Sequence, residues 1–228
     1  MTRPTRTVID WLVPLAALAA STVFVRATGV DVELERAFHD AVLGWRFAND
    51  EPWSALYHYG PVPAWIVAVG SLSLLVAARW RRSLRPHRRA FVYLALVMIV
   101  GPGLVVNSAF KEHWGRPRPM DLREFGGSYE YVRVWDKGDP QRGQSFPSGH
   151  AATGFYFFAL YFALRGRSRW SWVWLAVALT FGSVIGVARM VQGKHFVSDV
   201  VWAAGFVYFT ALLLAPMLPR PDRPSSAA

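Results

Sequence analysis

The 228-residue sequence contains no cysteine. This absence excludes a disulfide framework, zinc sites with cysteine ligands and catalysis by a thiol, although it does not identify the compartment. Common metal-site patterns are missing too. There is no HExxH pair of histidines, and the two motifs that contain His150 and His195 hold one carboxylate, Asp199. The sequence therefore predicts no metal site.

Acidic residues are scarce, with 15 Asp and Glu against 25 Lys and Arg, and the net charge is +10. Such a balance can indicate a nucleic-acid partner. Here most of the excess lies in short segments between apolar runs, above all in residues 79–89, which contain six arginines. Basic residues in short loops are typical of the cytoplasmic side of membrane proteins. We therefore interpret the charge as membrane topology and expect no nucleic-acid partner.

Apolar residues are abundant, at 53% of the chain, and they form long runs that a soluble protein does not require. Runs of about 16–22 residues predict six membrane-spanning helices. These cover residues 8–25, 61–78, 90–110, 149–164, 170–187 and 197–218. The first run is longer than the apolar core of a signal peptide, roughly 7–15 residues, which is the alternative interpretation. Gly101-Pro102-Gly103 should loosen or kink the third span.

Residues 30–47 have a different pattern, with apolar residues at helical spacing and acidic residues between them. This predicts an amphipathic helix between the first two spans, lying on the membrane surface or packed on the bundle. The predicted fold class is thus all-α, a polytopic membrane protein formed by one domain over residues 1–228. Its core covers about 8–218, and the tail 219–228 is expected to be disordered.

The arginine-rich turn at 79–89 places both chain ends in the cytoplasm and the segments 26–60, 111–148 and 188–196 outside. The topology depends on this turn, because residues 111–147 hold seven basic and six acidic residues. One consequence is that Lys111, His150 and His195 all lie at span ends on the same side.

The first candidate motif is Arg189-Met-Val-Gln-Gly-Lys-His195-Phe-Val-Ser-Asp199. If Asp199 opens a helix, it lies one turn from His195 on the same face. The carboxylate can then accept from one imidazole nitrogen and leave the other with a free lone pair, as a nucleophile or base needs. Arg189 could hold an anion beside the histidine. The alternative is a helix cap with a surface ion pair, but a charged cluster at the mouth of an apolar span usually has a function.

Two further clusters lie at span ends. Residues 111–119, Lys-Glu-His-Trp-Gly-Arg-Pro-Arg-Pro, offer three cations, and the prolines keep the chain extended. These cations could instead be anchors that snorkel to the head-group level. Residues 146–150, Phe-Pro-Ser-Gly-His, open the fourth span, where backbone N–H groups can bind phosphate oxygens. His150 could protonate a leaving oxygen, or this segment could be an ordinary helix cap. Together the clusters favour phosphoryl transfer through a phosphohistidine, with fixed cations in place of Mg²⁺.

Three motifs resemble, in order and spacing, the three-part signature of the type 2 phosphatidic acid phosphatase (PAP2) superfamily. They are Lys111-x6-Arg118-Pro119, Pro147-Ser148-Gly149-His150 and Arg189-x5-His195-x3-Asp199. The superfamily includes membrane lipid phosphate phosphatases and, more distantly, soluble acid phosphatases and vanadium haloperoxidases. The resemblance implies a six-helix bundle over most of the chain. One departure is Ala188, where the family often has a serine that contacts phosphate.

The resemblance also implies a role for each matched residue. Phosphate would be bound by Lys111, Arg118 and Arg189, together with Ser148 and the amide of Gly149. His195 would attack phosphorus, and Asp199 would hold and activate it. His150 would protonate the leaving alkoxide and then serve as base for water, with no metal or other cofactor. Arg116 is a further candidate for binding phosphate, whereas His113 is interpreted as structural.

The implied partners are a phosphorylated lipid and the bilayer. Residues 101–107, 125–127 and 191–193 resemble the lipid A phosphatase branch, which implies a bacterial inner membrane and a site facing the periplasm. Phosphatidylglycerol phosphate, undecaprenyl pyrophosphate and phosphatidic acid are the other candidate substrates. Aromatic residues in 120–146 could form a lid or mark the membrane interface. The alternative functions are a phosphotransferase with a lipid or sugar acceptor, and a lipid or anion carrier.

Overall fold

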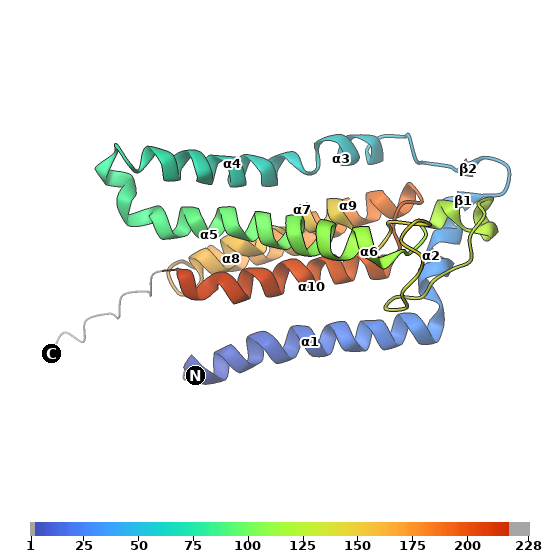
Figure 1. The fold of residues 1–228 in the computed structure, drawn as a ribbon, viewed down its shortest axis with the longest axis horizontal. Helices are drawn as coiled ribbons and strands as arrows, with labels where there is room; N and C mark the ends of the chain where they lie inside the picture. The colour runs from blue at the N-terminus through green and yellow to red at the C-terminus, as the bar shows by residue number, and fades with distance from the viewer. Residues whose placement is uncertain (1–2, 219–228) are drawn as a thin grey trace.

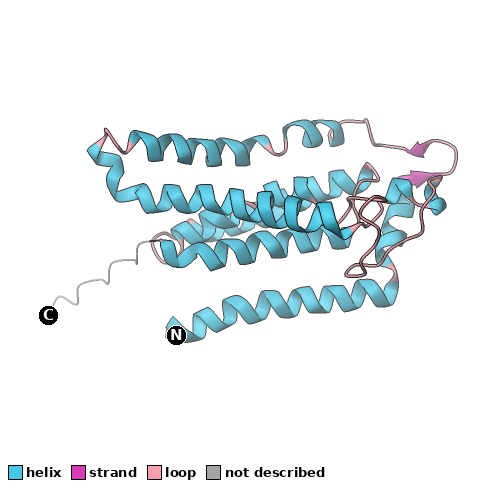
Figure 2. Cartoon of the chain, in the orientation of Figure 1, coloured by secondary structure: helices cyan, strands magenta, loops and turns pink. Residues whose placement is uncertain are grey.

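A computed structural model describes residues 3–218, and its helices lie roughly along one common axis (Figure 1). Helices dominate the described chain (Figure 2), which confirms the all-α prediction. The longer elements are α1 (Arg3–Thr28), α4 (Val62–Ala77), α5 (Arg88–Met98), the π-helical η2 (Ile99–Lys111), α9 (Ser171–Val191) and α10 (Val197–Leu214). The shorter helices are α2 (Val30–Phe38), α3 (Trp53–Tyr59), α6 (Glu112–Trp114), α7 (Gly149–Phe155) and α8 (Phe158–Leu164). Short 3-10 turns are η1 (Arg82–His87), η3 (Pro119–Asp121), η4 (Arg123–Phe125) and η5 (Ala215–Met217). The tail predicted to be disordered lies outside the described residues.

Within the described chain, five helical stretches are long and apolar enough to cross a membrane. They are Val8–Thr28, Trp53–Ala77, Arg82–Asp121, Ser171–Val191 and Val197–Met217. Large apolar side chains such as Leu12, Val23 and Ile66 are exposed on their outer faces, as expected for helices that face lipid. The chain is therefore an integral membrane protein. The predicted fourth span, 149–164, consists of two short helices, α7 and α8, with a turn at Tyr156 and Phe157.

The bundle core lies between α5, α7, α8, α9 and α10, where aromatic side chains fill the space and their polar ends find backbone partners. The hydroxyl of Tyr93 donates to the carbonyl of Ala211 at 3.0 Å, and that of Tyr156 donates to the carbonyl of Leu94 at 3.0 Å. Helices α7 and α9 cross very closely, because a Cβ on Gly154 would lie 2.7 Å from the Cα of Gly182. Small residues at such a crossing are typical of membrane helices.

The third span loses regular α-helical geometry at the Gly101-Pro102-Gly103 sequence. From Ile99 to Lys111 the backbone is π-helical. Proline has no N–H to donate, which frees an acceptor in the preceding turn, and the side chain of Asn107 donates to the carbonyl of Pro102 at 2.7 Å. The predicted irregularity thus takes the form of a wider helix, which ends at Lys111 beside the site.

The segment 30–47 differs from the predicted amphipathic helix. Only α2 is helical, and it is followed by a short antiparallel hairpin of β1 (His39–Asp40) and β2 (Gly44–Trp45). Asp31 and Glu35 face inward and are completely buried, whereas Val42 is 90% exposed at the hairpin tip. The helix predicted over residues 30–47 is therefore shorter than expected, and two of the acidic residues between its apolar positions turn toward the bundle.

The two ends of the bundle differ in chemistry. One end carries the start of α1, the end of α10 and the arginine-rich turns between α4 and α5 and between α8 and α9 (Figure 1). The opposite end carries α2, the hairpin, α6 and the loop that leads to α7 (Figure 1). The three sequence motifs meet at this second end.

Candidate active site

A cavity of about 520 Å³ opens at this end of the bundle. It brings together five of the predicted site residues from all three motifs: Lys111, Arg118, His150, Arg189 and His195. None of the lining side chains that the structure describes is acidic. Motif residues separated by up to 84 positions, from Lys111 to His195, therefore form one electropositive pocket, which can bind an anion.

His195 is held with one nitrogen bonded and the other free for chemistry. The residue is 1% exposed and lies between α9 and α10. Its Nδ1 lies 2.6 Å from the carbonyl oxygen of Ser145, a distance at which Nδ1–H donates. The Oδ2 atom of Asp199 is farther from Nδ1, at 3.7 Å. The backbone carbonyl thus selects the Nδ1–H tautomer, which leaves the lone pair on Nε2.

The imidazole of His195 is neutral at physiological pH in this environment. Burial lowers the pKa of His195 to about 3, and the positive charges of Lys111 and Arg189 act in the same direction. The carboxylate of Asp199 opposes this shift without cancelling it. A neutral imidazole with a free lone pair is the form that a nucleophile requires.

Asp199 orients this end of α10. Its Oδ2 accepts from the backbone N–H of Phe196 at 2.8 Å, which caps the helix, and from the hydroxyl of Ser145 at 2.5 Å. Its Oδ1 accepts a hydrogen bond from Arg116. The predicted pairing of His195 with Asp199 is therefore longer than a hydrogen bond, and Ser145 bridges the two residues by contacting both.

Arg189 has an unfilled donor beside the cavity. The side chain is 7% exposed, and its Nη1 donates to the side chain of Gln192. Within the described residues, its Nε–H has no hydrogen-bond partner. A buried guanidinium donor without an acceptor is costly, and an anion in the cavity would supply one.

Tyr57 of α3 supports two of the site residues. Its ring stacks on that of His150 with centroids 5.1 Å apart, and the guanidinium of Arg189 lies 4.5 Å from its centroid. Such cation–π and ring contacts fix the direction of both side chains. The sequence prediction missed Tyr57, and an aromatic residue between two spans gave no signal that separates it from an interfacial anchor.

Ser148 and Gly149 affect the shape of the site through their contacts with neighbouring residues. Ser148 is buried and its hydroxyl caps α7 by accepting from the N–H of Ala151 at 3.5 Å. A Cβ at Gly149 would lie 2.7 Å from Oδ1 of Asn107 and 3.5 Å from Nζ of Lys111. A side chain at this position would collide with Asn107, whereas its distance to Lys111 would be an ordinary contact. Contacts of Ser148 and Gly149 with phosphate remain a prediction.

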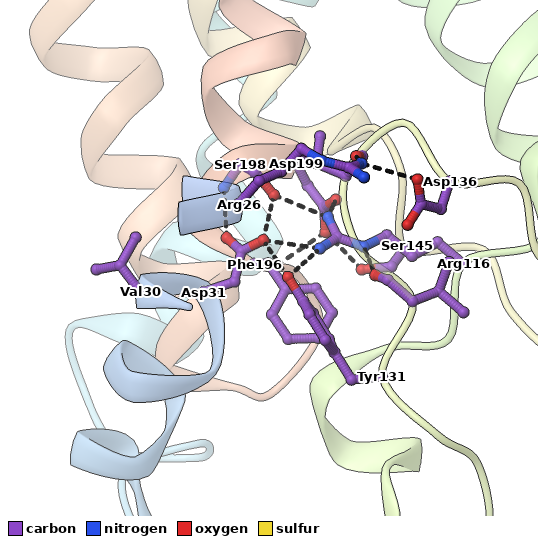
Figure 3. A network of polar contacts seen from close by, with 12 residues as sticks. Arg26, Val30, Asp31, Arg116, Tyr131, Asp136, Ser145, Phe196, Ser198 and Asp199 are labelled. Carbon is purple, nitrogen blue, oxygen red and sulfur yellow. Dashed lines mark hydrogen bonds and ion pairs between the residues drawn. The ribbon is translucent and has the colours of Figure 1, made fainter. Parts of the chain in front are cut away.

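Arg116, the additional candidate for phosphate, is placed elsewhere. Its side chain is completely buried and pairs with Asp31 at 2.7 Å and with Asp199. Figure 3 shows its guanidinium between these carboxylates, next to Ser198 and Tyr131. With its charge already paired, Arg116 is not directed at the cavity. The pattern of alternating prolines could not reveal a partner 85 residues away.

The hairpin covers the turn that precedes His195. Gly193 has a φ of +62°, and a Cβ there would lie 2.3 Å from the indole ring of Trp45 in β2. Trp45 lines the cavity. The carbonyl of Gly193 also accepts from the N–H of Met120 at 3.0 Å. The turn before His195 is thus packed between the hairpin and the segment after Arg118.

Lys194 adds a cation that the motif analysis did not assign. It lines the cavity directly beside His195, and its Nζ lies 2.8 Å from the sulfur of Met120. Burial lowers the pKa of Lys194, as do the charges of Arg118 and Arg189, whereas Asp121 acts in the opposite sense. With Lys111, Arg118 and Arg189, the cavity has four cationic side chains.

Within residues 3–218, no group of three or more His, Asp and Glu side chains is arranged to hold a metal ion.

Comparison with known proteins matches residues 87–223, more than half of the chain, to the PAP2 superfamily. The chain belongs to this superfamily. The matched region contains all three motifs and each of the five predicted site residues that line the cavity. It leaves out α2, the hairpin and α3.

Curated relatives of this PAP2 protein are lipid A phosphatases. A lipid A 4'-phosphatase of Francisella tularensis subsp. novicida is 36% identical over 59% of this chain and 60% of the relative. A lipid A 4'-phosphatase of Rhizobium leguminosarum is 37% identical over 51% of this chain and 50% of its own length. A lipid A 1-phosphatase of Rhizobium johnstonii is 31% identical over 54% of this chain and 46% of the relative. These relatives bear out the resemblance to the lipid A phosphatase branch.

The chain spans about half the length of the curated relatives it matches. No solved structure matches it at a significant level.

Proposed function

We propose that this PAP2 protein is a lipid phosphate phosphatase that works through a phosphohistidine and without metal. The observation that carries the proposal is the cavity itself. It combines four cations and an unpartnered Arg189 donor with a neutral His195 whose Nε2 lone pair is free. Cations bind a phosphate and stabilise its transition state electrostatically, while a neutral imidazole can attack phosphorus.

The proposed reaction has two steps. In the first, Nε2 of His195 attacks phosphorus, the bond from phosphorus to the lipid oxygen breaks, and His150, which enters the step as an imidazolium beside the bound phosphate anion, gives that oxygen its proton and becomes neutral. In the second, His150 takes a proton from water, which attacks the phosphohistidine and releases phosphate and neutral His195. The carbonyl of Ser145 and the carboxylate of Asp199 stabilise the positive imidazole that forms between these steps. Lys111, Arg118 and Arg189 hold the phosphoryl oxygens throughout.

We further propose that the site faces the periplasm of a bacterial inner membrane. The turns between α4 and α5 and between α8 and α9 lie at the end of the bundle opposite to the hairpin (Figure 1). Residues of the hairpin and of α3 line the cavity, and arginine-rich turns favour the cytoplasmic side. The cavity lies at the end of the spans, so an amphiphilic substrate reaches it from the outer leaflet. The named relatives favour lipid A as that substrate.

The test is phosphate release by the purified protein in detergent, with EDTA present. The substrates are lipid A, undecaprenyl pyrophosphate, phosphatidylglycerol phosphate and phosphatidic acid, each run beside His195→Ala. We expect release from lipid A that survives the chelator and disappears in the variant. Transfer of labelled phosphate to a lipid or sugar instead of water would identify a phosphotransferase. Bound lipid without release, unchanged by His195→Ala, would identify a carrier.

A further inference from the structure

A buried ion network connects α2 to the catalytic helix. One guanidinium nitrogen of Arg116, Nη2, donates to Asp31 at 2.7 Å, and the other, Nη1, donates to Asp199 and to the hydroxyl of Ser198 at 2.8 Å. The two carboxylates and the arginine are each 0% exposed. Figure 3 shows the contacts that join them. Buried charges of this kind are tolerated only when they are paired and hydrogen-bonded.

Asp31 is fully engaged in this arrangement. Its Oδ1 accepts from the backbone N–H of Ser198 at 2.9 Å. Its Oδ2 accepts from the hydroxyls of Ser198 at 2.6 Å and Tyr131 at 2.9 Å, as well as from Arg116. Two of these bonds reach Ser198 in the first turn of α10 and one reaches Arg116, which contacts that turn. The fourth joins Tyr131, whose hydroxyl also accepts from Arg116 at 3.2 Å. Asp31 thus fixes both the helix start and the fork of Arg116.

These contacts fix the rotation of the Asp199 carboxylate. Because Arg116 occupies Oδ1, the other oxygen, Oδ2, is the one that accepts from Ser145 and Phe196 and lies 3.7 Å from Nδ1 of His195. Ser145 in turn holds the imidazole through its carbonyl. If the carboxylate rotated, the hydroxyl of Ser145 would lose its acceptor. The carbonyl of Ser145 would then no longer fix the direction of the Nε2 lone pair of His195.

We infer that Asp31 and Arg116 are positioning residues for the nucleophile, acting through Asp199. The inference rests on the proposed function of His195. Asp31 lies outside residues 87–223, the part matched to the superfamily, so the N-terminal segment of this chain contributes to the catalytic geometry. A mispositioned nucleophile loses rate without losing phosphate affinity, because Asp31 and Arg116 do not line the cavity.

The experiment compares Asp31→Asn and Arg116→Lys with a matched control, Glu33→Gln, in the full chain in detergent. Glu33 lies on the same helix but is exposed and pairs with Arg36. We expect Asp31→Asn to lower kcat about 10- to 100-fold, with KM changed less than about twofold. Arg116→Lys should have the same effect, because a lysine ammonium cannot bond Asp31 and Asp199 in the geometry of the guanidinium. Glu33→Gln should match the wild type.

Two measurements separate positioning from a purely structural role. The first is the rise in thermal stability given by inorganic phosphate, which a positioning variant keeps. The second is the Nδ1–H signal of His195 in ¹⁵N-labelled protein, which a positioning variant weakens even if no substrate is turned over. A normal kcat and signal in Asp31→Asn would overturn the inference, and so would loss of phosphate binding together with kcat. Activity that does not depend on His195 would instead overturn the proposed function.

A second, independent observation concerns the charge of the cavity. A phosphate monoester carries at most two negative charges, and the three motif cations already exceed that number. Lys194 adds a fourth cation, and its amine contacts a thioether, which is a weak acceptor. We propose that Lys194 binds a second anionic group attached next to the scissile phosphate, as in a diphosphate ester.

The probes for this subsite are inorganic pyrophosphate and inorganic phosphate, with binding measured by calorimetry on the detergent-solubilised protein. The variant Lys194→Met keeps the stem and removes the charge, and Lys137→Met, at an exposed loop position, is its control. We expect Lys194→Met to weaken pyrophosphate binding about 10-fold or more and phosphate binding less than about twofold. Equal loss for both anions, or no preference for pyrophosphate in the wild type, would refute the subsite.

Discussion

At the scale of single residues, the site depends on which atoms hold the nucleophile. His195 is fixed by a backbone carbonyl, which substitution of side chains cannot remove, and Asp199 acts on it mainly through Ser145. Burial and nearby cations keep the imidazole neutral. The same surroundings favour binding of the anionic phosphate over protonation of the histidine.

Because of this environment, the stability of the folded protein depends on pH. His195 has a pKa of about 3 when folded, below its ordinary value of 6.5, so its contribution to stability is complete above pH 6.5. It is lost as the pH falls from 6.5 toward 3, at up to about 1.4 kcal/mol per pH unit. We expect wild type to lose about 2 kcal/mol more than His195→Gln between pH 6.5 and 5. Equilibrium unfolding in detergent at the two pH values measures this, and equal slopes would contradict the prediction.

At the scale of elements, α2 carries an acid with no partner. The carboxyl of Glu35 is completely buried, and within the described chain neither of its oxygens has a hydrogen-bond partner. Burial, followed by the charges of Asp199 and Asp31, raises the pKa of Glu35 to about 10. Glu35 is therefore protonated at neutral pH, which keeps a third negative charge away from the single cation, Arg116.

The sign of the effect for Glu35 is opposite to that for His195. Its folded pKa lies above its ordinary value of 4.5, so its contribution is complete below pH 4.5 and is lost as the pH rises toward 10. We expect the stability of Glu35→Gln, relative to wild type, to increase by up to about 1.4 kcal/mol for each unit between pH 6 and 9. Thermal unfolding across this range tests it, and a constant difference between the two proteins would show that Glu35 is ionised when folded.

The hairpin gives a second prediction at this scale. Gly193→Ala combines a left-handed backbone, which costs alanine about 1 kcal/mol, with a collision of its Cβ with Trp45. We expect kcat/KM to fall about 10-fold or more, because the turn before His195 shifts. Gly126→Ala is the matched control, since Gly126 has a φ of +87° and nothing within 4 Å of its Cβ position. Adding Trp45→Ala should restore much of the lost activity, and no restoration would show that strain alone is responsible.

The sequence predicted the convergence of the motifs but not what supports them. Lys111, His150 and His195 could be placed together because span lengths and the arginine-rich turn determine which ends share a side. The helical period of residues 30–47 could not show that Asp31 and Glu35 are buried, because a pattern of polarity does not reveal which side chains far along the chain a residue meets. Arg116 was misplaced for the same reason.

At the scale of the whole molecule, the chain separates charge along its length. The turns that hold most of the arginines lie at one end of the bundle, and the hairpin lies at the other (Figure 1). The cavity is lined in part by the hairpin residue Trp45. A hydrophobic middle keeps the two apart by the thickness of a bilayer. A phosphatase with this shape would take its substrate from one leaflet and release inorganic phosphate on that side only.

The absence of cysteine makes this orientation directly testable. Ser83, in the arginine-rich turn, and Ser128, in the loop beside the cavity, are both exposed. Each can be changed to a cysteine that is then unique in the chain. In a Gram-negative host, we expect a maleimide that cannot cross the inner membrane to label Ser128→Cys in intact spheroplasts. Ser83→Cys should react only after the membrane is opened, because basic turns stay in the cytoplasm. The reverse pattern would place the cavity in the cytoplasm and remove outer-leaflet lipids from the possible substrates, whatever the chemistry of His195.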